Sequence, residues 1–387
     1  MRWLVIYCVI FVAGCTSDIT LQPVVDRQST WGKVEILGQA QQAEPPALLT
    51  DNQDFSAAWI ITNTVDTYHV VNETLLTIPT TYPRNQALYP AENAFKHLLW
   101  IDAAYEGEGL RVWSAWISPD ETTERGPIPV SDRPTYHYDA LSMDDESLWL
   151  AWSGDLPGEP NIYVQYIDKQ GRNRAGERVA SSADFPVFVD GKLFWIGILD
   201  AMVHQADFVD GVLENERELV RMPDILRGDL LLNFQVGQDV THTYLIWNIQ
   251  RASGAVETWL SAGMAGDDNW TVPIRLGIDP QQGTEFETGF NGGFGLIAQA
   301  GEVWLSWGAV LPGTFNHLVI AAQAGNQLGV VYLAGGEVVG WQSVVTLPIG
   351  LIGSPQIRTN RELHLFLAWA EPTGNGYADL SLTTTRR

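Results

Sequence analysis

The chain has 387 residues, of which 45% are hydrophobic and 16 are tryptophan, so it is long enough to bury a large core. Its formal net charge of -24 disfavours nucleic-acid binding, because a protein that displaces the counterions of a polyanion needs a basic track. The same charge disfavours broad contact with anionic lipid head groups. We attribute the charge mainly to solubility, with binding of a cation as the alternative.

The first fifteen residues have the pattern of an export signal. Arg2 gives a basic start, an apolar run follows, and Val12–Gly14 places small residues before Cys15. This pattern resembles the lipobox of bacterial lipoproteins, which implies a signal peptide over residues 1–14 and acylation of Cys15. The apolar run is shorter than the roughly 20 residues needed to span a bilayer. We therefore expect an extracytoplasmic protein held to a membrane by lipid alone, the outer membrane if the host has one.

The cysteine content fits this location. Cys8 and Cys15 are the only cysteines. If Cys8 leaves with the signal and Cys15 carries lipid, the mature domain has no disulfide and must be stabilised by its core. Residues 16–30 are mostly small or polar, so residues 15–30 are interpreted as lipidated cysteine and tether, and residues 31–387 as one domain.

A module of two strands recurs along that domain. Each copy has a hydrophilic turn, an apolar strand with a tryptophan near its end, a turn-forming loop and a second strand, as in Met143–Gly171. The marker tryptophans recur every 40 to 60 residues or so, close to the size of a four-stranded propeller blade. The seven tryptophan strands are Phe55–Ile61, Phe95–Ile101, Ser147–Trp152, Lys192–Ile198, His242–Trp247, Glu302–Trp307 and Glu362–Trp369.

This periodicity predicts an all-β fold, a β-propeller of seven blades. The last copy lacks an outer strand, whereas Trp31–Gln39 alternates like a strand and has no partner before it. We expect this N-terminal strand to complete the last blade and close the ring, which removes exposed sheet edges. Six and eight blades are the alternatives, because Gly289–Gly295 could be a degenerate strand. The tryptophans are interpreted as core residues that pack between blades.

The loops that follow the tryptophan strands are expected on one face of the ring, including the loop at residues 308–314. Acidic side chains that converge there would produce a negative field at the mouth of the channel. Such a rim could bind a cationic ligand or Ca²⁺, which prefers carboxylate and carbonyl oxygens. Solvated loop tips are the alternative interpretation. The candidate rim residues are Asp66, Asp102, Tyr105, Glu106, Asp155, Glu159, Asp200 and Glu371, with Tyr105 as an aromatic contact for a partner.

Known catalytic motifs are missing from the sequence. It contains no nucleophile elbow, no P-loop and no H-E-x-x-H zinc motif, and its seven histidines lie far apart. The run Gly289–Gly295 is followed by a strand pattern and not by the helix that a phosphate-binding loop requires. No catalytic residue is therefore assigned, and no metal ligand is identified.

The series of strands, with segments such as Asn161–Arg172, resembles the sialidase-like and related exported β-propellers. That resemblance implies a site on the central rim, where several such glycosidases place paired carboxylates. The family's Asp-box turn is absent, since Asp190–Trp195 keeps only its Asp-Gly and its aromatic residue. Of the three arginines that bind the substrate carboxylate in sialidases, only Arg358 and Arg84 have candidate positions.

Three functions are compatible with these observations. We favour a lipid-anchored extracytoplasmic propeller that acts as a binding or scaffold module for a protein or glycan partner. The first alternative is a glycan-active hydrolase or lyase that uses rim carboxylates. The second is binding of calcium or a cationic ligand at the acidic rim.

Overall fold

The computed structural model describes residues 30–276 and 305–386, except for short internal segments. The predicted signal peptide, Cys15 and most of the tether therefore lie outside the described residues, as does the run Gly289–Gly295. Within the described part of the chain, no helix has the length and hydrophobicity needed to cross a membrane. The short segments left out are residues 41–43, 51–54, 63–66, 73, 82, 104–108, 157–158, 170, 173, 224, 240, 254–255, 265, 268, 312–316, 325–326, 348–351, 361–363 and 374–376.

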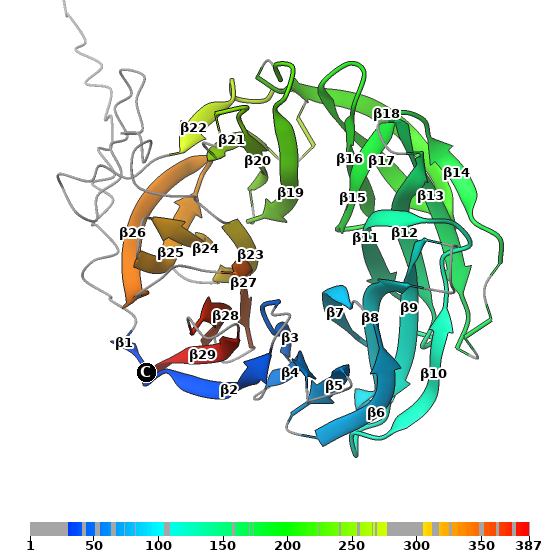
Figure 1. Ribbon diagram of the computed structural model, residues 1–387. Coiled ribbons are helices and arrows are strands. Elements are labelled where there is room, and N and C mark those ends of the chain that lie inside the picture. Colours follow the sequence, from blue (N-terminus) through cyan, green and yellow to red (C-terminus); the bar gives the residue numbers. More distant parts are fainter. Residues whose placement is uncertain are drawn as a thin grey trace, which may run out of the picture.

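Seven antiparallel sheets are arranged in a ring around a central channel (Figure 1), which confirms the predicted seven-bladed propeller. The one helical element in the described residues is the 3-10 turn η2 (Glu92–Ala94). Within the first six blades the strands follow one another in chain order from the channel outward.

The first six blades have four strands each. Blade 1 consists of β3 (Ala47–Thr50), β4 (Phe55–Thr62), β5 (Thr67–Val71) and β6 (Thr74–Thr80), and blade 2 of β7 (Arg84–Pro90), β8 (Lys96–Ala103), β9 (Leu110–Ile117) and β10 (Thr123–Pro129). Blade 3 consists of β11 (Thr135–Ser142), β12 (Leu148–Leu156), β13 (Glu159–Ile167) and β14 (Glu177–Ala180), and blade 4 of β15 (Ala183–Val189), β16 (Lys192–Gly197), β17 (Met202–Val209) and β18 (Val212–Arg221). Blade 5 consists of β19 (Leu230–Gln238), β20 (His242–Gln250), β21 (Val256–Met264) and β22 (Ile274–Leu276), and blade 6 of β23 (Leu305–Leu311), β24 (His317–Ala324), β25 (Gln327–Ala334) and β26 (Glu337–Thr346).

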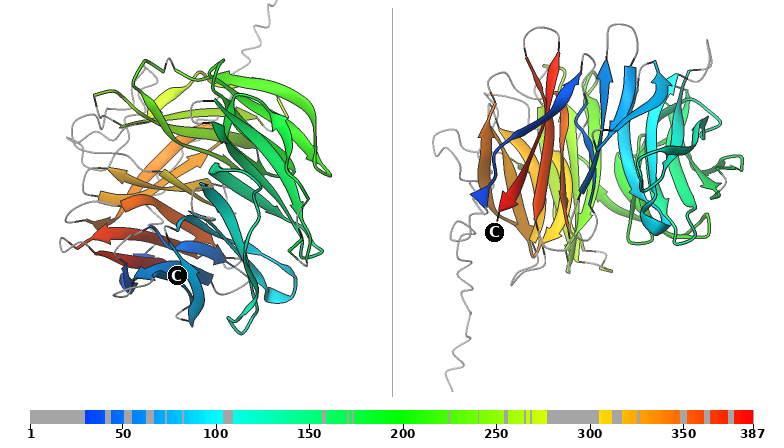
Figure 2. Two further views of the ribbon diagram at one scale, coloured as in Figure 1. Left: turned by 45° about the vertical axis from the view of Figure 1, so that its right-hand side comes forward. Right: turned by 90° about the horizontal axis from the view of Figure 1, so that it is seen from below.

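Blade 7 closes the ring with both ends of the domain. It contains β27 (Ile352–Thr359), β28 (Leu365–Pro372) and β29 (Ala378–Arg386), and the N-terminal strands β1 (Thr30–Trp31) and β2 (Glu35–Ala40) pair with β29. The side chain of Gln39 donates a hydrogen bond of 2.7 Å to Asp379 across this junction. Figure 2 shows the two ends of the domain side by side. The predicted closure by Trp31–Gln39 is therefore confirmed, with two short strands in place of one.

Six of the marker tryptophans form the structural core, as predicted. They lie on the second strand of their blades and are at most 3% exposed. Trp247 packs with Phe194 of blade 4, and Trp369 packs with Tyr332 of blade 6. The indole side chains therefore fill the space between neighbouring sheets. Loss of one such aromatic side chain typically costs about 3–5 kcal/mol of stability. The six are Trp59, Trp100, Trp152, Trp195, Trp247 and Trp369.

Blade 6 differs from the prediction. The segment Glu302–Trp307 was expected to be the second strand of its blade, but β23, which contains Trp307, is the first strand and lies at the channel. The sequence of β23, LSWGAVL, is as apolar as that of a second strand, so a tryptophan in an apolar run does not distinguish the two. As a result, residues 308–311 belong to β23 itself, and the connection that follows β23 joins a first and a second strand, not a second and a third.

The innermost strands share a local irregularity that shapes the channel. Because strand direction alternates, each innermost strand begins at the face that carries the loops between second and third strands, which we call the loop face. Near this end, β7, β11, β15, β19 and β27 each have a register shift against the second strand. Asn85 and Phe185 at two of these shifts have positive φ angles of 51° and 56°. Bulges of this kind change the direction in which side chains point, and here they occur on the strands that line the channel.

Candidate functional site

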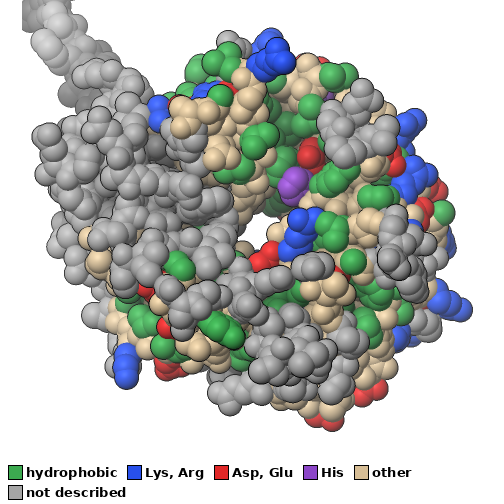
Figure 3. Space-filling view, viewed as in Figure 1, with side chains coloured by type: hydrophobic (Ala, Val, Ile, Leu, Met, Phe, Trp, Pro, Cys, Tyr) green, Lys and Arg blue, Asp and Glu red, His purple; other side chains and the backbone are tan. Residues whose placement is uncertain are grey.

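A cavity of about 640 Å³ occupies the centre of the ring, and we call it the channel pocket. Figure 3 shows the molecule hollowed at its centre, with acidic, basic and histidine side chains near the opening. The pocket is lined by the innermost strands of blades 2, 3, 4, 5 and 7 and by the segment before β3. Its polar lining residues include Glu44, Gln86, Tyr89, His137, Tyr138, Asp139 and Arg358.

A histidine–aspartate pair lies at the boundary of blades 3 and 4. His137 Nδ1 is 2.8 Å from Asp184 Oδ1, and Asp184 also accepts hydrogen bonds from the Ser153 hydroxyl and from the Phe185 backbone N–H. The imidazole stacks on the Phe185 ring, with 3.8 Å between centroids. The His137 side chain is 35% exposed, whereas Asp184 is 13% exposed. An imidazole that donates from Nδ1 keeps its lone pair on Nε2, the arrangement of an oriented general base.

Glu44 supplies a carboxyl group to the same pocket. It precedes β3, and its carboxylate accepts hydrogen bonds from the backbone N–H groups of Asn85 and Gln86 on β7. Burial raises the pKa of Glu44 to about 7, although these hydrogen bonds and the charge of Arg84 act in the opposite direction. A carboxyl group with this pKa can hold and release a proton near neutral pH, which is the property of a general acid.

Deeper in the channel, the carboxyl group of Asp139 on β11 connects blade 3 with blades 2, 4 and 7. Tyr89 donates its hydroxyl proton to Asp139 at 2.8 Å, and the N–H of Phe188 donates to the other oxygen at 2.7 Å. Burial raises the pKa of Asp139, and these hydrogen bonds partly oppose the shift. Arg358 on β27 faces Tyr89 and Asp139, and burial lowers the pKa of its guanidinium. Together with the hydrogen bond from the Ala140 N–H at 2.9 Å, these contacts join Asp139 to donors in three blades, so we assign it a structural role.

The predicted rim residues lie outside this pocket where the structure describes them. Asp102 is 4% exposed and accepts hydrogen bonds from Thr80 Oγ1 and from the Thr81 N–H. Asp200 pairs with His204 of its own blade at 3.0 Å, and burial raises the pKa of Glu371 on blade 7. Glu159 begins β13. Asp66, Tyr105 and Glu106 fall outside the described residues.

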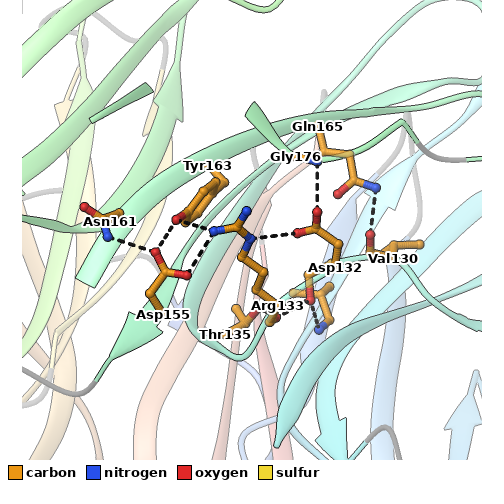
Figure 4. Close-up of polar contacts among 11 residues, drawn as sticks. Val130, Asp132, Arg133, Thr135, Asp155, Asn161, Tyr163, Gln165 and Gly176 are labelled. Atoms are coloured by element: carbon orange, nitrogen blue, oxygen red, sulfur yellow. Dashed lines mark hydrogen bonds and ion pairs between the residues drawn. The ribbon is translucent and has the colours of Figure 1, made fainter. Parts of the chain in front are cut away.

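Asp155 is held within blade 3 by several polar neighbours (Figure 4). Arg133 Nη1 lies 3.3 Å from Asp155 Oδ1 and donates to the Tyr163 hydroxyl at 2.8 Å, while the Asn161 amide donates to Asp155 Oδ2 at 2.9 Å. The Tyr163 hydroxyl also donates to Asp155. Partial burial raises the pKa of Asp155, but hydrogen bonds from Tyr163, Asn161 and Arg133 outweigh it and leave the pKa below its ordinary value. These contacts fix a residue whose φ is 92°.

Asp155 and Asp200 therefore bind partners in their own blades, whereas Asp102 of blade 2 binds Thr80 and Thr81 at the end of blade 1. Among the described residues, no group of three or more histidine, cysteine, aspartate or glutamate side chains could hold a metal ion. Apart from Arg358, which the resemblance to sialidases singled out, the site residues of the channel pocket were not identified from the sequence, because the candidates were sought in loops after the second strand. The available signal was weak: polar residues such as His137 and Asp139 interrupt a first strand that follows a proline.

No family model and no curated protein matches this sequence. Solved structures do match its fold. An ulvan lyase, a polysaccharide lyase bound to GlcA(1-4)Rha3S, has a TM-score of 0.53 and 9% identity over 90% of this chain and 94% of its own. An α-L-arabinanase of Penicillium chrysogenum complexed with arabinobiose has a TM-score of 0.51 and 15% identity over 88% and 98%. The polysaccharide lyase Uly1 has a TM-score of 0.50 and 10% identity over 91% of both chains. At these identities the similarity shows the propeller fold alone.

Proposed function

We propose that this protein is a glycan-active enzyme that hydrolyses its substrate in the channel pocket. The observation that carries the proposal is that Glu44 and the His137–Asp184 pair line or adjoin the same cavity. Glu44 comes from the segment before blade 1 and contacts blade 2, whereas the pair comes from blades 3 and 4. The neighbours of known activity, an arabinanase and two polysaccharide lyases, support a glycan as substrate.

The roles of the residues follow from their environments. Glu44, whose pKa burial raises to about 7, donates a proton to the glycosidic oxygen as the bond to the anomeric carbon breaks. His137 Nε2 removes a proton from the attacking water molecule, and Asp184 stabilises the imidazolium that forms. A separated acid and base with a water molecule between them is the arrangement of inverting glycosidases.

Hydrolysis is favoured over elimination by the position of the arginine in the pocket. A lyase that removes a proton beside a carboxylate needs a cation to neutralise that carboxylate. Arg358 lines the pocket, but its guanidinium already faces Asp139 and Tyr89. The expected role as a binding or scaffold module is not supported by a comparable feature, whereas a cavity that contains an acid and a base supports the glycan-active alternative.

We also propose that a lipid on Cys15 anchors the protein to a membrane. Thr30 pairs with Arg386 at the end of β29, and β29 begins at the loop face, so Thr30 lies at the opposite face. A lipid on Cys15 would therefore leave the loop face directed away from the membrane. Metabolic labelling with palmitate should label the wild-type chain and not Cys15→Ser, and equal labelling of both would refute acylation at this residue.

The proposed activity is tested by incubating the full chain with neutral and uronate-containing polysaccharides. We expect new reducing ends without the ultraviolet absorbance of unsaturated sugars. Glu44→Gln should lose this activity, whereas Glu371→Gln, which changes a carboxyl group outside the pocket, should retain it. Absorbance from unsaturated products would replace hydrolysis by elimination. Absence of cleavage on all substrates would refute the proposed function.

A further inference from the structure

Phe185 on β15 has a backbone conformation that is unusual for a bulky residue. Its φ of 56° lies in the left-handed region that favours glycine, so the conformation costs free energy. The residue lies at the register shift between Asp184 and Val187, where β15 has one residue more than the facing part of β16. Strained backbone of this kind persists only where the surrounding structure holds it, and it is concentrated at functional sites.

The irregular backbone brings two consecutive side chains of β15 against one imidazole ring. Asp184 Oδ1 lies 2.8 Å from His137 Nδ1, and the Phe185 ring stacks on the same imidazole with 3.8 Å between centroids and 23° between planes. In a regular strand, consecutive side chains point to opposite faces of the sheet, so they could not both contact one ring. The strained conformation of Phe185 is therefore a condition for this double contact.

The two contacts restrict different motions of the imidazole. A single hydrogen bond at Nδ1 leaves the ring free to turn about that bond, whereas an aromatic ring packed flat against it removes this freedom. The Phe185 side chain is itself fixed, because it is buried in the core cluster of blades 4 and 5. Its backbone N–H also donates to Asp184 Oδ1 at 2.7 Å, the same oxygen that pairs with His137. Phe185 thus contacts both members of the His137–Asp184 pair.

We propose that Phe185 is a positioning residue that fixes the plane of the His137 imidazole and so the direction of its Nε2 lone pair. This inference rests on the proposed function, in which Nε2 removes a proton from water. His137 and Phe185 both line the channel pocket. The competing explanation is that Phe185 only fills the core. Both explanations predict a loss of stability when the ring is removed, but only a positioning role predicts a change in the imidazole and in kcat.

The experiment compares Phe185→Leu with Phe194→Leu in the full chain. Leucine keeps an apolar side chain but has no flat ring to stack on the imidazole. Phe194 is a matched control because it is a buried phenylalanine of the same core cluster, on β16, and is not among the residues that line the channel pocket. Phe185→Tyr is a third variant, which keeps the flat ring.

Three measurements are made on each variant. Thermal unfolding gives the stability, and steady-state kinetics on the substrate found in the polysaccharide screen give kcat and KM. Nitrogen NMR of protein labelled with ¹⁵N-histidine, recorded at alkaline pH, shows which ring nitrogen of His137 carries the proton. The His137 signals are assigned by their absence from the spectrum of His137→Gln.

We expect the proton on Nδ1 in the wild type and in Phe185→Tyr. Phe185→Leu should populate both tautomers, because the imidazole can turn away from Asp184. Its kcat should fall by about tenfold to a hundredfold with little change in KM, since a misplaced base slows the reaction without weakening binding. Phe194→Leu should lose stability but keep the wild-type tautomer and kcat.

The inference is overturned if Phe185→Leu loses stability but keeps the wild-type tautomer and kcat, which is the result expected of a residue that only fills the core. It is also overturned if Phe194→Leu changes the tautomer and kcat as strongly, or if Phe185→Tyr loses as much as Phe185→Leu. A proton on Nε2 of His137 in the wild type would overturn it without any variant.

The two proposals fail separately. If Phe185→Leu alone changes the His137 tautomer but the wild type cleaves no glycan, the positioning role of Phe185 stands and the hydrolytic chemistry is wrong. If the wild type cleaves a glycan and Phe185→Leu keeps both the tautomer and kcat, the hydrolytic chemistry stands and the role of Phe185 is wrong.

Discussion

His137 and Asp184 form a hydrogen bond of 2.8 Å across the boundary between blades 3 and 4, from the first strand of each blade. The two residues are far apart in sequence, so the pair exists only when the two sheets pack together. Asp184 is further fixed by the Ser153 hydroxyl and the Phe185 N–H. Blade packing and a defined imidazole orientation are therefore parts of one arrangement.

The substitution Asp184→Asn should strongly reduce glycan cleavage. It removes the carboxylate that orients His137 and stabilises its protonated form, so kcat should fall by roughly a hundredfold to ten-thousandfold with little change in KM. Steady-state kinetics on the substrate found in the polysaccharide screen measure both constants. Asp200→Asn is the matched control, because Asp200 pairs with His204 outside the channel pocket. Equal losses in both variants would contradict the role of the His137–Asp184 pair.

Cleavage should depend on the protonation of Glu44. Burial raises the pKa of Glu44 to about 7, and its protonated form is the competent acid, so kcat/KM should fall as pH rises through about 7. The pH–rate profile of the full chain measures this basic limb. Glu371→Gln should keep the limb unchanged, since Glu371 lies outside the pocket. A profile that is flat up to pH 9 in the wild type would exclude Glu44 as the acid.

Two buried histidines should make the fold sensitive to acid. Burial lowers the pKa of His69 and of His97 from 6.5 to about 4. Between pH 6.5 and 4 the unfolded chain binds more protons than the folded chain, so the free energy of unfolding falls as pH falls, by up to about 3 kcal/mol per histidine. Urea unfolding between pH 7 and 4.5 measures the slope. His97→Gln should have a shallower slope than the wild type, and identical slopes would refute this contribution of His97.

Closure of the ring should depend on the backbone of the N-terminal segment. Gly32 donates its N–H to the Thr384 carbonyl at 2.7 Å and accepts a hydrogen bond from Thr383 Oγ1. Gly32→Pro removes the donor and should lower the free energy of unfolding by roughly 2 kcal/mol, because one edge of β29 loses a partner. Gly32→Ala keeps the donor and serves as the control. Equal stabilities of the two variants in chemical unfolding would contradict closure through this contact.

Much of the propeller could be predicted from the sequence because its signal is local and repeated. Trp100, Trp152 and Trp247 end apolar strands at intervals that match a blade, and all three are buried between sheets. The closing strand was predictable because the last module was one strand short. The order of strands in blade 6 was not, since Trp307 ends an apolar run that is as hydrophobic in a first strand as in a second.

The candidate site could not be predicted because its contacts join residues of different blades. Asp155 and Asp200 stood out as acids in loops, yet each pairs with a neighbour in its own blade. His137 and Glu44 carry no motif, and their proximity to one cavity follows from the curvature of the ring. The burial that raises the pKa of Glu44 is a tertiary effect that residue spacing does not encode.

The most direct test of the proposed hydrolysis is a crystal structure of the full-length Glu44→Gln variant with an oligosaccharide of the cleaved glycan. We predict that the saccharide occupies the channel pocket, with the scissile oxygen within about 3 Å of the side chain at position 44 and the anomeric carbon facing His137 Nε2. A saccharide bound at the outer loops, with neither residue in contact, would contradict the assignment of the channel pocket as the catalytic site.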